Sequence, residues 1–317
     1  MIPVSGKLLR LSWPVIDPKY FGLSFSSKQC RSFKLDEQAT LGFLLKKVGF
    51  RRFRLMSYWN EHEKTPGNYD FTALDQQIAL IKKSSGSVTL CLGARQPRWP
   101  ESHWPKWALD LPQAERYEAL YRFIENVVDR YKNNPTIISW QLENEALNRS
   151  FGRNGDFNRT RLHHEYQLLK QRDPSRPVIM STSNTWGIPI RRPRPDIFGF
   201  TLYQTQFENG TYSHSKLPLW WWPLRARIIR LVPGRPCFIH ELQAEPWGPK
   251  AIWEMPVDEQ SKSMGVEQIK TNMRLAKQTK LYPIDLWGGE WWYWRHLQGD
   301  ETIWQTVQRE LAHSSVK

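Results

Sequence analysis

The chain has 317 residues, of which 40% are hydrophobic and 24% charged, a composition that excludes disordered and fibrous proteins and fits a folded globular one. An α/β barrel of this length is common as one unit, so we expect a single domain over residues 1–317. The net charge of +14 indicates an anionic environment or partner. The basic residues are scattered and no zinc-finger, RNA-recognition or helix-turn-helix signature organises them, which argues against nucleic acid.

Cysteine usage and the absence of targeting signals bear on the compartment. Cys30, Cys91 and Cys237 are far apart and have no metal-ligand spacing, which argues against a disulfide framework and favours a reducing compartment. Basic residues and a proline interrupt the apolar residues of positions 1–16, and no apolar run approaches the length of a membrane span. We therefore expect a cytoplasmic protein that needs no metal and no organic cofactor, and its oligomeric state stays open.

Short apolar runs alternate with longer helical patterns along the chain. Eight such alternations without a dinucleotide-binding glycine pattern favour a closed parallel (β/α)8 TIM barrel over an open doubly wound sheet. The runs expected to form strands are Tyr20–Phe25, Phe50–Ser57, Val88–Gly93, Ile137–Leu142, Val178–Ser183, Gly199–Tyr203, Cys237–His240 and Ile284–Trp287.

Helices are expected where apolar residues recur at spacings of three and four. This pattern predicts helices over Leu41–Val48, Tyr117–Tyr131 and Val266–Ala276, and Asp70 caps the start of another. Between the fifth and seventh strands the helical pattern is weaker, because the chain there is rich in proline and arginine.

Two of the expected strands end in glutamate. Glu145 closes the sequence Glu143-Asn144-Glu145 after the fourth strand, and Glu241 follows the seventh. Burying a carboxylate is costly, and in a barrel the carboxyl ends of the strands form the catalytic face. Glycoside cleavage needs two carboxyl groups, one to protonate the leaving oxygen and one to meet the anomeric carbon. Structural ion pairs with arginines are the alternative, and Glu143 is expected to point away from its neighbours.

These residues carry a resemblance to a known family. The segment Trp140–Glu145 resembles the Asn-Glu signature that ends strand four in clan A glycoside hydrolases, the retaining (β/α)8 enzymes that include cellulases, β-mannanases and β-galactosidases. Phe238–Glu241 resembles the nucleophile strand of the same clan. The resemblance implies that Glu145 is the acid/base, that Asn144 binds the substrate 2-hydroxyl and that Glu241 is the nucleophile.

The resemblance extends to three further positions. Arg54 is similar to the clan arginine that lies beneath the nucleophile and helps keep it ionised. Tyr203 resembles the tyrosine whose hydroxyl contacts the nucleophile, and Trp287 resembles the tryptophan that floors the subsite of the cleaved sugar. The competing interpretations are a buried counter-ion for Arg54 and core aromatics for the other two.

Loops that follow the second, third and eighth strands are rich in aromatic and acidic residues. Clan members have similar residues there, so these positions are candidate sugar contacts, with loop packing as the competing interpretation. The candidates are Trp59, Glu63, Gln96, Trp99 and Trp292.

A basic aromatic segment, Leu217–Val232, includes three consecutive tryptophans and alternating basic and apolar residues. It is expected either to make a peripheral membrane contact, with its arginines on anionic lipids, or to form the sixth barrel helix with its apolar face on the sheet.

The predicted function is that of a cellulase-like retaining β-glycoside hydrolase that cleaves a β-linked oligo- or polysaccharide by double displacement. A transglycosylase with the same covalent intermediate is one alternative, and a non-catalytic glycan-binding barrel is another. The identity of the sugar and the choice between endo and exo action stay open.

Overall fold

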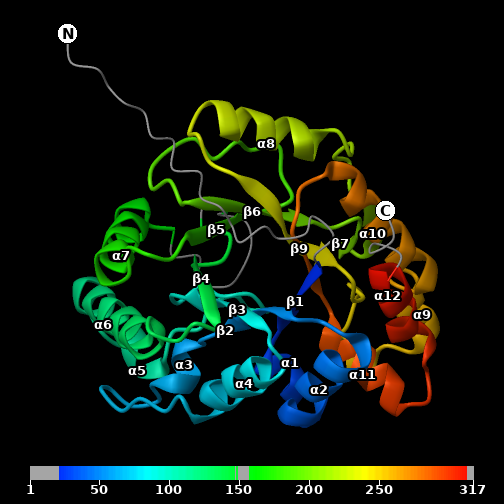
Figure 1. Cartoon of the computed structure of the whole chain (residues 1–317), viewed down its shortest axis with the longest axis horizontal. Coiled ribbons are helices and arrows are strands. Elements are labelled where there is room, and N and C mark those ends of the chain that lie inside the picture. The colour runs from blue at the N-terminus through cyan, green and yellow to red at the C-terminus, as the bar shows by residue number, and fades with distance from the viewer. Residues whose placement is uncertain (1–20, 147, 149–156, 313–317) are drawn as a thin grey trace.

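The computed structural model describes residues 21–146, 148 and 157–312 (Figure 1). In this part of the chain eight parallel strands close a barrel in the order β1-β10-β9-β6-β5-β4-β3-β2, so β9 and β10 are its seventh and eighth strands. Every predicted strand is confirmed, with ends shifted by at most three residues; Tyr20 and residues 1–16 lie outside the described residues. The barrel strands are β1 Phe21–Phe25, β2 Arg52–Met56, β3 Ser87–Leu92, β4 Ile137–Leu142, β5 Val178–Thr182, β6 Ile197–Leu202, β9 Cys237–Gln243 and β10 Ile284–Trp287.

Helices surround the barrel (Figure 1), because each must bury one apolar face against the sheet. In the described chain none is long and apolar enough to cross a bilayer. The predicted helices all form, the first of them as the end of α2 and a π-helical turn, η1. The bounds are α1 Ser27–Ser32, α2 Glu37–Phe43, η1 Leu44–Val48, α3 Trp59–His62, α4 Thr72–Lys83, α5 Lys106–Leu109, α6 Gln113–Tyr131, α7 Arg159–Arg172, α8 Trp221–Leu231, the 3-10 turn η2 Ile252–Glu254, α9 Val257–Ser261, α10 Val266–Thr279, α11 Gly289–Leu297 and α12 Thr302–Ala312.

The segment Leu217–Val232 contains the sixth barrel helix. Helix α8 turns Trp221, Trp222, Ala226 and Ile229 inward, which confirms the barrel-helix interpretation. By contrast, residues 183–196 between β5 and β6 form no helix. The prolines of this connection explain the difference, because each lacks the N–H that a helix interior requires.

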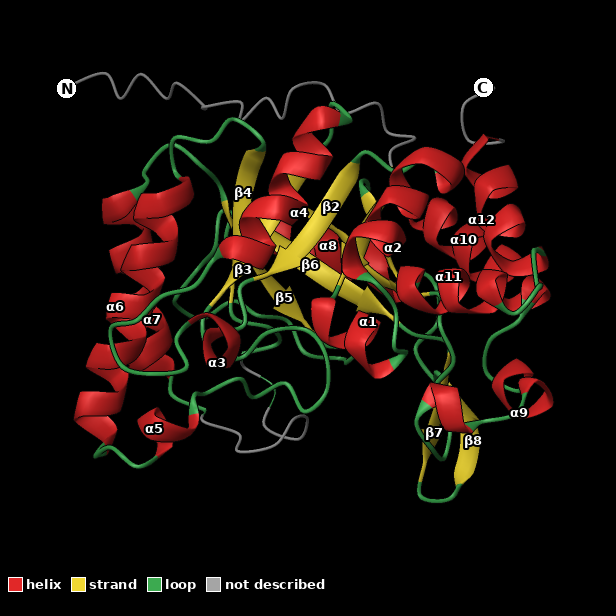
Figure 2. Ribbon diagram, turned by 90° about the horizontal axis from the view of Figure 1, so that it is seen from below, coloured by secondary structure: helices red, strands yellow, loops and turns green. Residues whose placement is uncertain are grey.

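A β-hairpin that the sequence analysis missed follows the sixth barrel strand. Strands β7 (Thr205–Glu208) and β8 (Thr211–His214) pair antiparallel across Asn209 and Gly210, which both have positive φ. An Asn-Gly pair is a strong hairpin signal, so this element was within reach of the sequence. Figure 2 shows the hairpin projecting from the barrel.

Polar side chains fill part of the barrel interior. Arg52 donates to Asp285 at 2.9 Å, and the two ring nitrogens of His240 lie 2.6 Å from Asp285 and 2.8 Å from Gln141. Burial raises the pKa of Asp285, but the charge of Arg52 and the His240 hydrogen bond outweigh it and hold the pKa at about 2. This network ties β2, β4, β9 and β10 together.

The network predicts a large effect of a small substitution at Gly22 in β1. A Cβ there would lie 2.0 Å from Asp285 Oδ1 and 3.1 Å from Arg52 Cδ. Neither side chain can move away easily, because the two form an ion pair with each other. We expect Gly22→Ala to lower the free energy of unfolding by about 1–3 kcal/mol in urea denaturation. The control is Gly42→Ala in α2, where a Cβ meets nothing within 4 Å, and it should stabilise by about 0.5–1 kcal/mol. Equal stability of Gly22→Ala and the parent would contradict a rigid network.

Candidate active site

A cavity of about 1400 Å³ lies where the barrel strands end. Its walls come from the loops that follow nearly all of the strands, as expected for the catalytic face of a barrel. The structure brings five of the predicted site residues to this cavity: Trp99, Glu145, Tyr203, Glu241 and Trp287.

The turn after β4 directs its two glutamates to different places. Glu143 and Glu145 both have positive φ, at 51° and 44°, a conformation that side chains with a Cβ rarely adopt. Glu143 accepts from the backbone N–H groups of Ala94 and Arg95 and does not line the cavity, as predicted. Glu145 turns toward the cavity, and its backbone N–H donates to Ser181 Oγ at 2.8 Å. Such strain persists only where the surrounding contacts impose it.

Neutral donors surround the Glu145 carboxyl group. Thr201 Oγ1 donates to one oxygen at 2.9 Å, and Asn148 Nδ2 lies 3.4 Å from the other. Burial raises the pKa of Glu145, and the nearby charge of Glu241 raises it further. Glu145 is thereby suited to hold a proton.

A β-bulge brings Glu241 into the barrel mouth. Phe200 pairs with Ile239, but the next residue, Thr201, pairs with Glu241, so His240 is an extra residue on β9. Without it, His240 and Glu241 would face opposite sides of the sheet. With it, His240 joins the interior network and Glu241 reaches the cavity.

Two donors hold the Glu241 carboxylate. Arg54 Nη2 donates to Oε2 at 2.5 Å, and the Tyr203 hydroxyl donates to Oε1 at 3.2 Å. The guanidinium of Arg54 is fully buried and also bonds to Ser24 at 2.8 Å. Burial and the charge of Glu241 raise the pKa of Tyr203 well above its usual value, so this tyrosine stays a donor. Glu241 therefore accepts from a charged donor, whereas Thr201 and Asn148, which donate to Glu145, are neutral.

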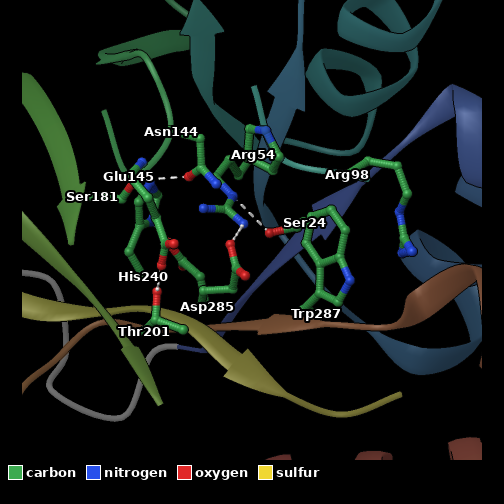
Figure 3. A network of polar contacts seen from close by, with 12 residues as sticks. Ser24, Arg54, Arg98, Asn144, Glu145, Ser181, Thr201, His240, Asp285 and Trp287 are labelled. Carbon is green, nitrogen blue, oxygen red and sulfur yellow. Dashed lines mark hydrogen bonds and ion pairs between the residues drawn. The ribbon is translucent and has the colours of Figure 1, made fainter. Parts of the chain in front are cut away.

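Trp287 lies between two guanidinium groups. The centre of its ring is 5.4 Å from Arg54 and 4.6 Å from Arg98. Figure 3 shows these three side chains. Its indole N–H donates to Glu245 at 2.7 Å, and Arg98 donates to the same oxygen at 2.6 Å. Trp287 thus lines the cavity as predicted, but Arg98 covers part of the ring face that the prediction assigned to a sugar.

Asn144 does not line the cavity. Its Nδ2 donates to both carboxyl oxygens of Glu101, at 3.1 and 3.0 Å, and its Oδ1 accepts from Ser181 and Gln141. This arrangement does not support the predicted direct contact with a sugar hydroxyl. Glu101 lines the cavity instead, and burial followed by the charges of Glu145 and Glu241 raises its pKa well above the usual value.

Four of the predicted sugar contacts do not line this cavity. Trp59 stacks on Phe123 in the core and donates to Glu63, whose other oxygen accepts from the Gly67 N–H. The other two, Gln96 and Trp292, are fully buried and donate to backbone carbonyl groups. Sequence alone did not separate these packed residues from the exposed Trp99, because the burial of a loop side chain depends on distant segments.

No sequence pattern assigned a role in the site to four further residues near the two glutamates: Glu101, Asn148, Thr201 and Glu245. Each contacts a predicted site residue, but their positions depend on loop paths that no local pattern specifies. In the described residues no group of three histidine, cysteine or acidic side chains is arranged to bind a metal ion.

The electrostatic coupling of the two glutamates is testable. Replacing Glu241 by Gln removes a negative charge that raises the pKa of Glu145. We expect the pKa of Glu145 in Glu241→Gln to be lower than in the parent protein, as followed by carbon-13 NMR of the glutamate carboxyl groups. The control is Glu63→Gln, which changes a buried carboxyl group outside the cavity and should leave the pKa of Glu145 unchanged. An unchanged or higher Glu145 pKa in Glu241→Gln would contradict the coupling.

Comparison with known families gives one match. Residues 39–170 match the family model Glyco_hydro_42, described as beta-galactosidase, which covers fewer than half of the 317 residues. Comparison with curated proteins gives no match.

Solved structures similar to this chain are (β/α)8 enzymes of low sequence identity. A beta-galactosidase from Halorubrum lacusprofundi is 15% identical with a TM-score of 0.59, and the match covers 93% of this chain and 57% of the galactosidase chain. Xylanase10C from Cellvibrio japonicus is 13% identical with a TM-score of 0.63, and the match covers 93% of this chain and 66% of the xylanase chain. GH5_18 from Streptomyces cattleya is 11% identical with a TM-score of 0.61, covering 93% and 79%. The chain therefore spans less than two thirds of the length of the first two.

At these identities the structural likeness shows the fold. That fold is the closed (β/α)8 barrel of the described chain, and the family-model match lies within it.

Proposed function

We propose that this barrel is a clan A retaining β-glycoside hydrolase for a β-linked oligo- or polysaccharide, with Glu241 as nucleophile and Glu145 as acid/base. The observation that carries the proposal is the difference between the two carboxyl groups of one cavity. Glu241 accepts from a buried guanidinium, whereas the described donors to Glu145 are neutral and the pKa of Glu145 is raised. Acid and nucleophile roles require two carboxyl groups in such different environments.

The proposed reaction has two displacements at the anomeric carbon. Glu145 gives its proton to the glycosidic oxygen while a Glu241 oxygen bonds to the anomeric carbon, and the leaving sugar departs as an alcohol. Glu145, now ionised, takes a proton from a water molecule, whose oxygen attacks the same carbon and releases Glu241. As the bond to Glu241 forms, its negative charge disappears, and the ion pair with Arg54 weakens.

A transglycosylase would use the same first step and a sugar hydroxyl in place of water. Product analysis with an added acceptor sugar separates the two reactions: free reducing sugar alone supports hydrolysis, and a lengthened product supports transfer. A glycan-binding barrel without catalysis would give neither product.

An aryl-glycoside screen tests the function. We expect turnover of at least one nitrophenyl β-glycoside among galactosides, xylosides, glucosides, mannosides and N-acetylglucosaminides, and none by Glu241→Ala. Glu145→Gln should lose about 10²- to 10⁴-fold in kcat on natural glycosides, and less on nitrophenyl glycosides because this leaving group needs no proton. A 2-deoxy-2-fluoro glycoside should add its mass to the peptide that contains Glu241. Turnover by Glu241→Ala equal to that of the parent would refute the assignment.

We also propose that the outer face of α8 binds anionic membranes. This outer face consists of Trp220, Leu224, Arg227, Arg230 and Leu231, all exposed, and the exposed Val232 follows it. An exposed indole with leucines suits the apolar boundary of a bilayer, and arginines are attracted to anionic lipid. A cytoplasmic location stays a prediction that fits the anionic lipid of the inner leaflet.

Vesicle co-sedimentation tests the membrane contact. We expect the protein to sediment with phosphatidylglycerol vesicles at low salt, less at high salt, and not with purely zwitterionic vesicles, because salt screens the arginine charges. The double variant Leu231→Ser with Val232→Ser should sediment several-fold less. Val257→Ser, a change of an exposed valine on α9, should sediment like the parent. No sedimentation at low salt would refute this proposal and leave the enzymatic one untouched.

A further inference from the structure

The size of the cavity exceeds what one sugar ring needs. Pockets for a single small ligand usually hold about 300–1000 Å³, whereas this cavity holds about 1400 Å³. It also extends away from the paired glutamates, since residues of α1 line it together with residues from the loops of β5 and β6. The reacting pair therefore occupies only part of a longer space.

Two exposed indoles lie in the wall of this space. Trp99 is 54% exposed and Trp253 is 41% exposed, although most tryptophans of the described chain are buried. Trp253 packs edge-on against Phe33 at the end of α1, with ring centres 5.6 Å apart. Phe33 in turn packs on Trp294 at 5.2 Å, so Trp253 is held in place while part of its ring stays accessible. A fixed, accessible indole in a cavity wall is suited to stack on an apolar sugar face.

Polar side chains complete the outer parts of the walls. The hairpin β7–β8 contributes Gln206, Glu208 and Asn209, and α1 contributes Lys28 and Gln29. Figure 2 shows the hairpin as a separate projection beyond the barrel. It extends the cavity wall and is not one of the strands that close the barrel. Donors and acceptors at these positions match the hydroxyl groups of a chain that continues past the cleaved sugar.

We infer that the cavity is a cleft with several subsites, in which Trp99 and Trp253 stack on sugars beyond the cleaved unit, and that the enzyme cuts within a glycan chain. This inference rests on the proposed function and adds endo action to it. The substrate class is a β-linked chain of at least about four sugar units, because the cavity holds more than one small ligand and the two indoles belong to different loops.

Chain-length dependence tests the inference. The probes are β-1,4-linked oligosaccharides of glucose, mannose and xylose with two to six units, beside the nitrophenyl monosaccharides. We expect kcat/KM to rise at least about 10-fold from the disaccharide to the pentasaccharide, because each added stacked ring buries apolar surface. Early products should be shortened chains rather than single sugars. Release of monosaccharide only, with equal kcat/KM for all lengths, would overturn the inference.

Single variants locate the subsites. Trp99→Ala and Trp253→Ala should each lower kcat/KM on the pentasaccharide by about 5- to 50-fold, and should lower it much less on the nitrophenyl monosaccharide. The matched control is Trp186→Ala, since Trp186 is 55% exposed but packs on Trp220 and Trp221 and does not line the cavity. It should behave like the parent on both substrates. Equal losses on both substrates for Trp99→Ala and Trp253→Ala would assign them a merely structural role and overturn the inference.

Different results would refute the inference and the proposed function. If a 2-deoxy-2-fluoro glycoside labels Glu241 but chain length has no effect, the function stands and the cleft is refuted. If no glycoside is cleaved or trapped, the proposed function is refuted. In that case titration calorimetry with the same oligosaccharides decides the cleft: affinity that rises with length and falls in Trp253→Ala supports it, and affinity independent of length, or none, overturns it.

Discussion

The contact between Arg54 and Glu241 is the interaction on which the site depends. A fully buried guanidinium from β2 meets a carboxylate from β9 that is largely covered. Removing either partner would leave a buried charge without compensation, at a cost of about 3–5 kcal/mol. The pair therefore fixes two distant strands with respect to each other and places a negative charge at the mouth of the barrel.

The surrounding network explains how the barrel tolerates this charge. Gln141 contacts both Arg54 and His240. His240 is hydrogen-bonded to Asp285, which also accepts from Arg52. Opposite charges alternate along this path, so the barrel interior remains balanced although several ionisable groups are buried. The same balance extends to the cavity, where the acidic groups Glu101 and Glu245 lie beside Arg95 and Arg98. A strongly basic protein thus holds a cavity whose central side chains are carboxyl groups.

Much of the fold could be predicted because its signals are local. Each barrel strand is a short apolar run buried on both faces, and strand-end glutamates stand out against such runs. The positions of Glu145 and Glu241 on the same face follow from barrel geometry once the strands are known. The Asn-Gly turn of the β7–β8 hairpin is an equally local signal, although the two strands beside it are not apolar runs like those of the barrel.

The rest depends on contacts that no local pattern encodes. The extra residue at His240 is visible only in the register between β6 and β9, yet it decides which side of the sheet Glu241 faces. Trp59 and Trp99 look alike in the sequence, but the first is buried against Phe123 and the second is 54% exposed. Glu101 could not be recognised as a partner of Asn144, because its loop reaches β4 only in the folded chain.

The central claim is that Glu241, held by Arg54 and Tyr203, attacks the sugar directly. Proton NMR of a β-glycoside during the first minutes of hydrolysis, before the free sugar equilibrates, reports the anomer that is released first. Two displacements predict the β-anomer, because the configuration inverts twice. Release of the α-anomer would mean that water attacks the substrate itself, and would contradict the account.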